Sequence, residues 1–321
     1  MDKVRDKVVA VVVTYNRRPL LSRCIAALMS QTRQVDLIVV INNNSEDDTK
    51  AYLDSLDQSK VCAIHAPDNL GGAGGFHLGI RIAMLLGGEF LWLMDDDGYP
   101  ERSCLETTLD GLQRSSLDIA NALVLADDNI EQLAFPINTR DAVIADAQQA
   151  IDLGTIHDVI MPFNGTLIRR SLIDRIGNID FRFFIWGDEI EFWKRAGRHE
   201  AKMATICSAR FFHPRGRTSS IGVPFLGSVP TTTPDRRGLL VRNRMRIALK
   251  YRGRFQMAIR LLGFAVIYGA TYGPKSFFST LRYGLDAMGE GVLSPASADL
   301  SAKMKRSIAV AEQQIQARLG K

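Results

Sequence analysis

The sequence predicts an α/β fold with a mainly parallel central sheet, and three observations lead to that prediction. Apolar, β-branched runs alternate with amphipathic helical segments through residues 7–97, an order typical of doubly wound sheets. Polar clusters follow four of the predicted strands at their carboxyl ends, where such sheets bind ligands. The 321 residues are also enough for one large hydrophobic core.

The first elements follow from local patterns. Three helices are expected: one over 20–29 after Pro19, which suits an early helical position; one that begins with Ser45 as its N-cap; and one that runs from a glycine-rich turn to about residue 86. Strands are expected between them, because each segment is a short apolar run rich in β-branched residues, over 7–15, 35–41, 61–66 and 89–94.

The later part of the chain is less regular. Helices are expected over 142–151 and 188–196. A stretch rich in Gly, Ser, Thr and Pro, up to residue 234, predicts a mobile loop near the site. Strands are expected over 118–125, 161–169 and 201–212.

Charge divides the chain into an acidic body and a basic tail. Residues 236–321 hold 16 Lys and Arg against 4 Asp and Glu, whereas residues 1–235 hold 24 against 31. We therefore expect a catalytic domain over 1–235, with halves 1–117 and 118–235, followed by a helical basic region over 236–321. The amino terminus carries no signal peptide, and the four cysteines form no CxxC pair, so we expect a cytoplasmic protein without structural zinc.

The basic region has no acidic residue between positions 236 and 285, and it contains the apolar run 261–269. That run is too short to span a bilayer, which needs roughly 20 apolar residues. Peripheral contact of 236–285 with the inner face of the cytoplasmic membrane is one interpretation. Packing on the body or on another subunit of a homo-oligomer is the alternative, and nucleic acid is not an expected partner.

Asp95-Asp96-Asp97 closes the apolar run Phe90–Met94. Three adjacent carboxylates repel one another, so the cluster indicates either a hard divalent metal or an acidic turn before Gly98. The glycine-rich turn 69–76 would let a phosphate approach the backbone or let a helix pack closely. A dinucleotide fingerprint is excluded, because His77 stands where its third glycine would be.

Two further groups could carry chemistry. Asp188 and Glu189 follow the aromatic run 181–186, where a carboxyl group with a raised pKa would suit a general base; helix-dipole partners are the simpler interpretation. His213, between Phe212 and Pro214, is either a structural histidine or a metal ligand.

Seven motifs in order resemble family 2 glycosyltransferases with the GT-A fold. The nucleotide-sugar half is represented by VVTYNR (12–17), NNNSEDDT (42–49), NLGGAGGF (69–76) and WLMDDD (92–97). The acceptor half is represented by FNGTLIRR (163–170), WGDEIEF (186–192) and FHP (212–214). The resemblance covers residues 8–255. Within the family it is strongest to galactofuranosyltransferases, and bacterial rhamnosyltransferases come next.

The resemblance implies roles for individual residues. Asp95, Asp97 and His213 would hold Mn²⁺ or Mg²⁺, and Glu189 would be the general base, with Asp188 as the second choice. The sugar and acceptor pocket would involve His77, Asn164, Gly165 and Trp186. The nucleotide sugar would be bound by Thr14, Tyr15, Asn16, Arg17, Asn42, Asn44, Asn69, Gly74, Gly75 and Asp96. Asn42 stands where the family often has an Asp that faces uracil, so the base remains open.

The resemblance further implies an inverting, metal-dependent glycosyltransferase. UDP-galactofuranose is the first choice of donor and dTDP-rhamnose the second. The expected acceptor is a hydroxyl of a glycan or a lipid-linked polysaccharide, as in O-antigen biosynthesis. A nucleotidyltransferase is a more distant alternative. Such an enzyme would have its glycine-rich loop after the first strand, whereas the glycine-rich turn of this chain lies far downstream, at 69–76. A non-catalytic binding module is disfavoured by the complete set of carboxylates with His213.

Overall fold

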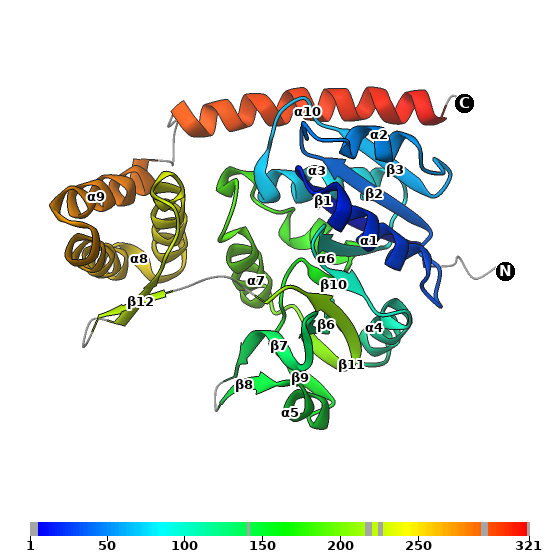
Figure 1. Ribbon diagram of the computed structural model, residues 1–321, viewed down its shortest axis with the longest axis horizontal. Coiled ribbons are helices and arrows are strands. Elements are labelled where there is room, and N and C mark those ends of the chain that lie inside the picture. The colour runs from blue at the N-terminus through cyan, green and yellow to red at the C-terminus, as the bar shows by residue number, and fades with distance from the viewer. Residues whose placement is uncertain (1–5, 140–141, 216–219, 224–226, 290–294, 320–321) are drawn as a thin grey trace.

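Eleven strands form one mixed sheet within the part of the chain that the computed structural model describes, residues 6–139, 142–215, 220–223, 227–289 and 295–319. The main path runs β3-β2-β1-β4-β10-β6-β11-β5, and β7, β8 and β9 attach beside it (Figure 1). The strands are β1 (Val8–Thr14), β2 (Leu37–Asn42), β3 (Val61–His65), β4 (Phe90–Asp95), β5 (Tyr99–Pro100), β6 (Ile119–Ala126), β7 (Asn129–Asn138), β8 (Val143–Asp146), β9 (Thr155–His157), β10 (Asn164–Arg169) and β11 (Met203–His213).

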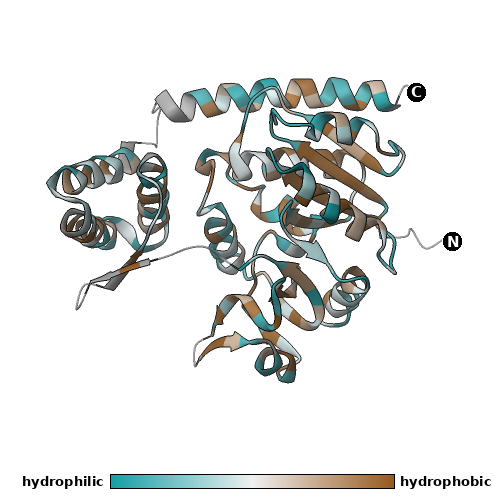
Figure 2. Ribbon diagram, viewed as in Figure 1, coloured by the Kyte–Doolittle hydropathy of each residue, from teal (hydrophilic) through white to brown (hydrophobic). Residues whose placement is uncertain are grey.

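The first four strands of this path are parallel, as the sequence predicts. Strand β1 pairs with β2 and β4, and β2 pairs with β3. Thr14 is in register with Asn42, and Val13 is in register with Asp95, so the carboxyl ends of β1, β2 and β4 lie at the same edge. All residues of β1 and β2 are buried, and Figure 2 shows the central strands in brown. The polar residues that follow these strands are therefore gathered at one edge.

Helices cover both faces of the sheet. Alternate residues of β1 pack against α1 and α4 on one face and against α3 on the other. The helices are α1 (Arg18–Met29), α2 (Thr49–Asp54), α3 (Gly71–Leu85), α4 (Cys104–Arg114), α5 (Ala147–Asp152), α6 (Arg170–Ile176), η1 (Phe181–Phe183), α7 (Asp188–Arg198), α8 (Pro234–Tyr272), α9 (Pro274–Gly289) and α10 (Pro295–Leu319).

Two local predictions are wrong. The segment 142–151 begins as strand β8 and becomes helical only at Ala147, because Asp146 is an extended N-cap residue that accepts a hydrogen bond from Gln149 N at 2.9 Å. Ser45 does not cap α2, which begins at Thr49; its hydroxyl instead accepts a hydrogen bond from Asn16 N at 3.0 Å.

The stretch expected to be a loop up to residue 234 contains a hairpin of β12 (Ser220–Val223) and β13 (Gly227–Pro230). The remaining parts of that prediction at 216–219 and 224–226 lie outside the described residues.

The carboxyl-terminal helices lie in two places. Helices α8 and α9 pack together, whereas α10 crosses back over α3 and β3 (Figure 1). On α10, the Gln314 side chain accepts a hydrogen bond from His65 N at 3.1 Å and donates one to His65 O at 3.3 Å. Arg318 donates to Val61 O at 2.9 Å. Side chains of α10 thus satisfy backbone groups on the outer edge of strand β3.

Among the described helices, one, α8 over 236–272, is long and apolar enough by length and composition to cross a membrane. Its backbone leaves helical geometry at Gly253, where φ is 82° and ψ is 174°. Only 28% of its most apolar stretch is buried, so α8 does not resemble a helix in the core of a soluble protein.

Candidate active site

Arg17 joins two of the three carboxylates that follow β4. Its Nη1 atom donates to Asp97 Oδ2 at 2.7 Å and to Asp96 Oδ1 at 3.2 Å, and Thr14 Oγ1 donates to Asp96 Oδ2 at 2.7 Å. Burial raises the pKa of Asp96 to about 6. Burial and the charges of Asp97 and Asp96 raise the pKa of Asp95 to about 8. A further cation beside Asp95 would lower that pKa and favour its carboxylate form.

His213, at the end of β11, lies beside Asp97. Its Nε2 atom is 3.2 Å from Asp97 Oδ1, and its Nδ1–H donates to Pro214 O at 2.6 Å. Burial lowers the pKa of the His213 imidazole, but the Asp97 carboxylate outweighs burial and raises it. Burial raises the pKa of Asp97 in turn, yet His213 and Arg17 hold it below its usual range. The geometry therefore favours a charged imidazolium–carboxylate pair.

The Asp97 carboxylate and the His213 imidazole fit a divalent cation that substrate oxygens help to hold. Asp97 Oδ1 is buried beside His213 Nε2, and Mn²⁺ accepts both carboxylate and neutral imidazole ligands. Ions of this kind are often bound by one or two protein groups together with phosphate oxygens. Among the described side chains, no three of His, Cys, Asp and Glu already converge as a metal site. Asp97 and His213 are thus the pair that lies together, and Asp95 does not complete a preformed set of three.

A cavity of about 540 Å³ lies against the carboxyl ends of β1, β2 and β4. The start of α3, the segment before α7 and the start of α8 complete its walls. Six residues expected in the site line it: Thr14, Tyr15, Arg17, Asn69, Asp95 and Asp96. The sequence prediction missed Val13, Asn43, Gly71, Gly72, Phe184, Ile185, Arg236 and Leu239.

Asn43 is the asparagine of the 42–44 run that lines the cavity. It is buried, accepts a hydrogen bond from Leu70 N at 2.8 Å and donates one to Gly71 O at 2.9 Å. Asn42 is buried and uses its amide on Ser45 N and His65. Asn44 is exposed in a left-handed conformation, with a φ of 62°. The expected contacts of Asn42 and Asn44 with a nucleotide are therefore not evident in this geometry.

The glycines of the 69–76 turn have two different roles. Gly71 has a φ of +69°, and a Cβ atom there would lie 2.0 Å from Phe184 O. Gly74 and Gly75 lie inside α3, where an added Cβ would come within 2.6 Å of Leu70 and 2.4 Å of Val13, respectively. Gly74 and Gly75 therefore permit close packing of α3, which the sequence left as an alternative, and Gly71 and Gly72 line the cavity.

Asp188 and Glu189 begin α7 but differ in environment. Asp188 is buried, and burial together with the Glu189 and Asp95 charges raises its pKa well above the usual range. Glu189 is half-buried, and its Oε2 atom accepts a hydrogen bond from Gly187 N at 2.7 Å. Burial and these neighbouring charges therefore favour the protonated form of the Asp188 carboxyl group.

The other predicted residues lie in several places. Asn16 accepts a hydrogen bond from Glu46 N at 2.7 Å. The Oδ1 atom of Asn164 is buried without a hydrogen-bond partner, whereas left-handed Gly165 lets the Phe211 ring pack against it. His77 does not line the cavity: its Nδ1–H donates to Ile179 O at 2.7 Å, on another side of α3.

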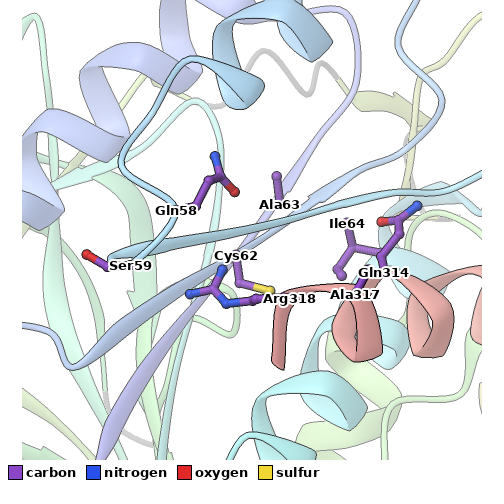
Figure 3. A pocket seen from close by; sticks show the side chains of 8 residues that line it. All are labelled: Gln58, Ser59, Cys62, Ala63, Ile64, Gln314, Ala317 and Arg318. Atoms are coloured by element: carbon purple, nitrogen blue, oxygen red, sulfur yellow. The ribbon is translucent and has the colours of Figure 1, made fainter. Parts of the chain in front are cut away.

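A separate cavity of about 450 Å³ lies between β3 and α10, away from this site (Figure 3). Cys62, Gln314 and Arg318 contribute to its walls. Burial raises the pKa of the Cys62 thiol, and all four cysteines of the chain are buried and free.

Comparisons with known sequences agree with the order of the motifs. Residues 9–177 match glycosyl transferase family 2. The galactofuranosyltransferase GlfT1 of Mycolicibacterium smegmatis is 32% identical over 239 residues, which cover 72% of this chain and 78% of that protein. GlfT1 of Mycobacterium tuberculosis is 34% identical over 219 residues, covering 66% and 71%. The glycosyltransferase GlyG of Streptococcus pneumoniae is 25% identical over 111 residues, covering 34% and 36%.

Among solved structures, GalNAc-T7 with UDP, GalNAc and Mn²⁺ is similar, with a TM-score of 0.59 and 14% identity. The match covers 88% of this chain and 55% of GalNAc-T7, so the chain spans about half the length of that protein. At this identity the similarity concerns the fold alone, and it confirms the predicted GT-A architecture.

Proposed function

The chain belongs to glycosyl transferase family 2, and from that premise we propose that it transfers galactofuranose from UDP-galactofuranose to an acceptor hydroxyl. Glycosyl transfer follows from the family. The sugar is proposed from the 32–34% identity to galactofuranosyltransferases over most of the chain, which is the observation that carries this choice.

Glu189 is the proposed general base. Its half-buried carboxylate is held at the start of α7 by Gly187 N–H, whereas burial favours the protonated form of Asp188, which makes Asp188 the poorer proton acceptor. Glu189 would take the proton of the acceptor hydroxyl while that oxygen attacks the anomeric carbon. Attack on the side opposite the nucleoside diphosphate inverts the configuration at that carbon.

The diphosphate is proposed to lie between the acidic cluster and the glycine start of α3. Arg17 would place a positive charge beside it, and the backbone of Gly71 and Gly72 would permit close approach. Asp97 and His213 would hold Mn²⁺ or Mg²⁺, which when bound would supply Lewis-acid stabilisation of charge on the leaving group. Asp96, fixed by Thr14, would contact the nucleotide.

A donor screen tests the sugar. Purified enzyme is given UDP-galactofuranose, UDP-galactopyranose or dTDP-rhamnose, each with Mn²⁺ or with EDTA, and nucleotide release is measured with a glycan acceptor. We expect the fastest release from UDP-galactofuranose with Mn²⁺. Preference for dTDP-rhamnose would assign the alternative rhamnosyltransferase activity, and equal rates in EDTA would contradict the metal requirement.

The acceptor is proposed to be lipid-linked at the inner face of the cytoplasmic membrane, because α8 carries an unpartnered apolar stripe. We define the stripe as Phe255, Ile259 and Leu262, spaced along one helix face and 76%, 51% and 55% exposed. Met257 and Leu261, on the opposite face, are buried. An exposed apolar face opposite a packed one is typical of a helix that lies on a membrane.

Positive charge accompanies the stripe. Burial and the charges of Arg252 and Arg244 lower the pKa of Arg260, so these guanidinium groups repel one another. Burial, Arg252 and Arg260 likewise lower the pKa of Lys194 on α7. A surface of anionic lipid would relieve this repulsion, with about 1 kcal/mol for each basic residue near the surface.

Vesicle sedimentation tests the membrane contact. Phe255→Ser/Ile259→Ser should lose binding to phosphatidylglycerol vesicles, whereas Leu85→Ser, at an equally exposed site (58%) on α3, should bind as the wild type does. Arg252→Gln/Arg260→Gln should weaken binding by about 2 kcal/mol, roughly 30-fold. Wild-type binding by the stripe variant would contradict the proposal. Light scattering that shows a dimer lost only in that variant would assign the stripe to a second copy.

A further inference from the structure

The segment 183–187, which joins the end of η1 to the start of α7, has an unusual backbone. Phe184 and Trp186 both have a φ of 63°, and Gly187 has a φ of 97°. Residues other than glycine rarely adopt this left-handed region, and they stay in it only where surrounding contacts fix them. Phe184 and Ile185 form a wall of the cavity, and Glu189 follows two residues after the segment ends.

Asn243 on α8 supplies those contacts from one side. The side chain is 1% exposed, and its Nδ2 atom lies 2.9, 2.9 and 2.8 Å from the carbonyl oxygens of Phe183, Ile185 and Trp186, so that its two N–H groups are shared among three acceptors. Its Oδ1 atom accepts a hydrogen bond from Arg242 Nε at 3.1 Å, which orients the amide. One carboxamide therefore contacts three carbonyl groups of the segment.

The start of α3 holds the same segment from the other side. Ala73 N donates to Phe184 O at 3.1 Å. That carbonyl occupies the space where a side chain on Gly71 would begin, only 2.0 Å from a Cβ atom there. Gly71 O in turn accepts a hydrogen bond from buried Asn43, at the end of β2. The segment is thus held from two sides. The start of α3, at the carboxyl edge of the sheet, contacts one side, and α8, more than fifty residues later in the chain, contacts the other.

We propose that Asn243 is a positioning residue for glycosyl transfer. Its amide holds segment 183–187, which places the cavity wall and the Gly187 N–H that binds the Glu189 carboxylate at 2.7 Å. The beginning of α8 is accordingly part of the catalytic site, and its Arg236 and Leu239 also line the cavity. The inference rests on the proposed role of Glu189 as the base.

Asn243→Asp is the sharpest variant, because it has the same size and replaces the donating NH₂ by an oxygen that faces three carbonyls. Asn243→Ala removes the donor without adding charge and serves if the Asp variant does not fold. The matched control is Tyr268→Phe on the same helix, which deletes a buried hydroxyl bonded to Pro230 O at 2.7 Å, outside the segment.

Three measurements are made below the unfolding temperature of every variant: kcat and KM for nucleotide release with the best wild-type donor, UDP affinity by calorimetry, and amide hydrogen exchange over 183–189. For the Asn243 variants we expect kcat to fall about 100-fold, since a displacement near 1 Å can cost that much. UDP affinity should change less than about 5-fold, and exchange over 183–189 should become faster. Tyr268→Phe should match the wild type in all three.

Wild-type kcat in folded Asn243→Asp and Asn243→Ala would overturn the proposal. So would a lower kcat with unchanged exchange over 183–189, since the segment would then not be held by this amide. If the wild-type enzyme transferred no sugar from any donor, the proposed function would fail by itself. Faster exchange in the Asn243 variants would still support the positioning of the segment, and unchanged exchange would overturn it.

Discussion

Replacing Glu191 by Gln tests whether a buried ionic network joins α7 to α8. Glu191 is 1% exposed and binds Arg195 through both oxygens at 3.0–3.2 Å, Lys250 at 2.6 Å and the Tyr251 hydroxyl at 3.0 Å. Removing one member of a buried ion pair costs about 3–5 kcal/mol, because the remaining charge is left without its partner. The magnitude here depends on what Arg195 and Lys250 retain.

Arg195 and Lys250 both keep favourable contacts in the Glu191→Gln variant. The guanidinium of Arg195 also donates to the backbone oxygens of Ile176, Gly177 and Asn178 at 2.6–2.9 Å, and the Lys250 side chain is 50% exposed and can turn to water. We therefore expect the lower end of the range, about 3 kcal/mol, in the free energy of unfolding from urea titration at pH 7. Glu312→Gln is the matched control, because its pair with Arg81 is half exposed and should cost less than about 1 kcal/mol.

The same network predicts a pH dependence. Burial raises the pKa of Glu191, but the hydrogen bonds and charges of Arg195 and Lys250 outweigh burial and lower it. A carboxyl group whose pKa is lower in the folded state stabilises the fold above its unfolded pKa, near 4.5, and loses that contribution as the pH falls through the folded pKa. The stability difference between wild type and Glu191→Gln should thus shrink below about pH 4.5. A difference that is small at pH 7, or constant with pH, would refute the reasoning.

Three other predictions concern the site. Glu189→Gln should reduce turnover by about 10²–10⁴-fold and still bind UDP with Mn²⁺ in calorimetry; near-normal turnover would exclude Glu189 as the base. Asp97→Asn should weaken UDP binding in Mn²⁺ far more than in EDTA, and equal losses would argue against a metal role. Gly71→Ala should lower UDP affinity and the thermal midpoint because of the contact with Phe184, whereas Gly72→Ala, where an added Cβ meets no protein atom, should leave the thermal midpoint unchanged.

Local sequence patterns predicted the part of the fold that depends on local chemistry. The β-branched runs identified the parallel strands β1, β2, β3 and β4, and the register of those strands explains why the polar ends meet. The segment 143–146 was mistaken for helix because its extended conformation comes from pairing with β7, the strand just before it, and not from its own residue types. Such pairing overrides weak local preference.

The candidate site was less predictable where it depends on long-range contacts. Asn43 lines the cavity and Asn42 and Asn44 do not, but the sequence does not show this, because the position of Asn43 depends on its hydrogen bond to Gly71 O. Nothing local marks Asn243, an ordinary polar residue within a basic helix, because its three acceptors lie nearly sixty positions earlier. Motifs therefore identified six of the residues that line the cavity, but not those that support them.

The contact between Gln314 and His65 has a consequence for synthesis of the chain. The two residues are 249 positions apart, so strand β3 emerges long before the helix that covers it. At 5–20 residues per second, the interval is roughly 12–50 s. During that time the outer backbone groups of β3 can pair with a neighbouring nascent chain. Variants shortened at the carboxyl terminus to remove α10 would make that exposure permanent, so we expect them to aggregate even where every residue of the site is intact.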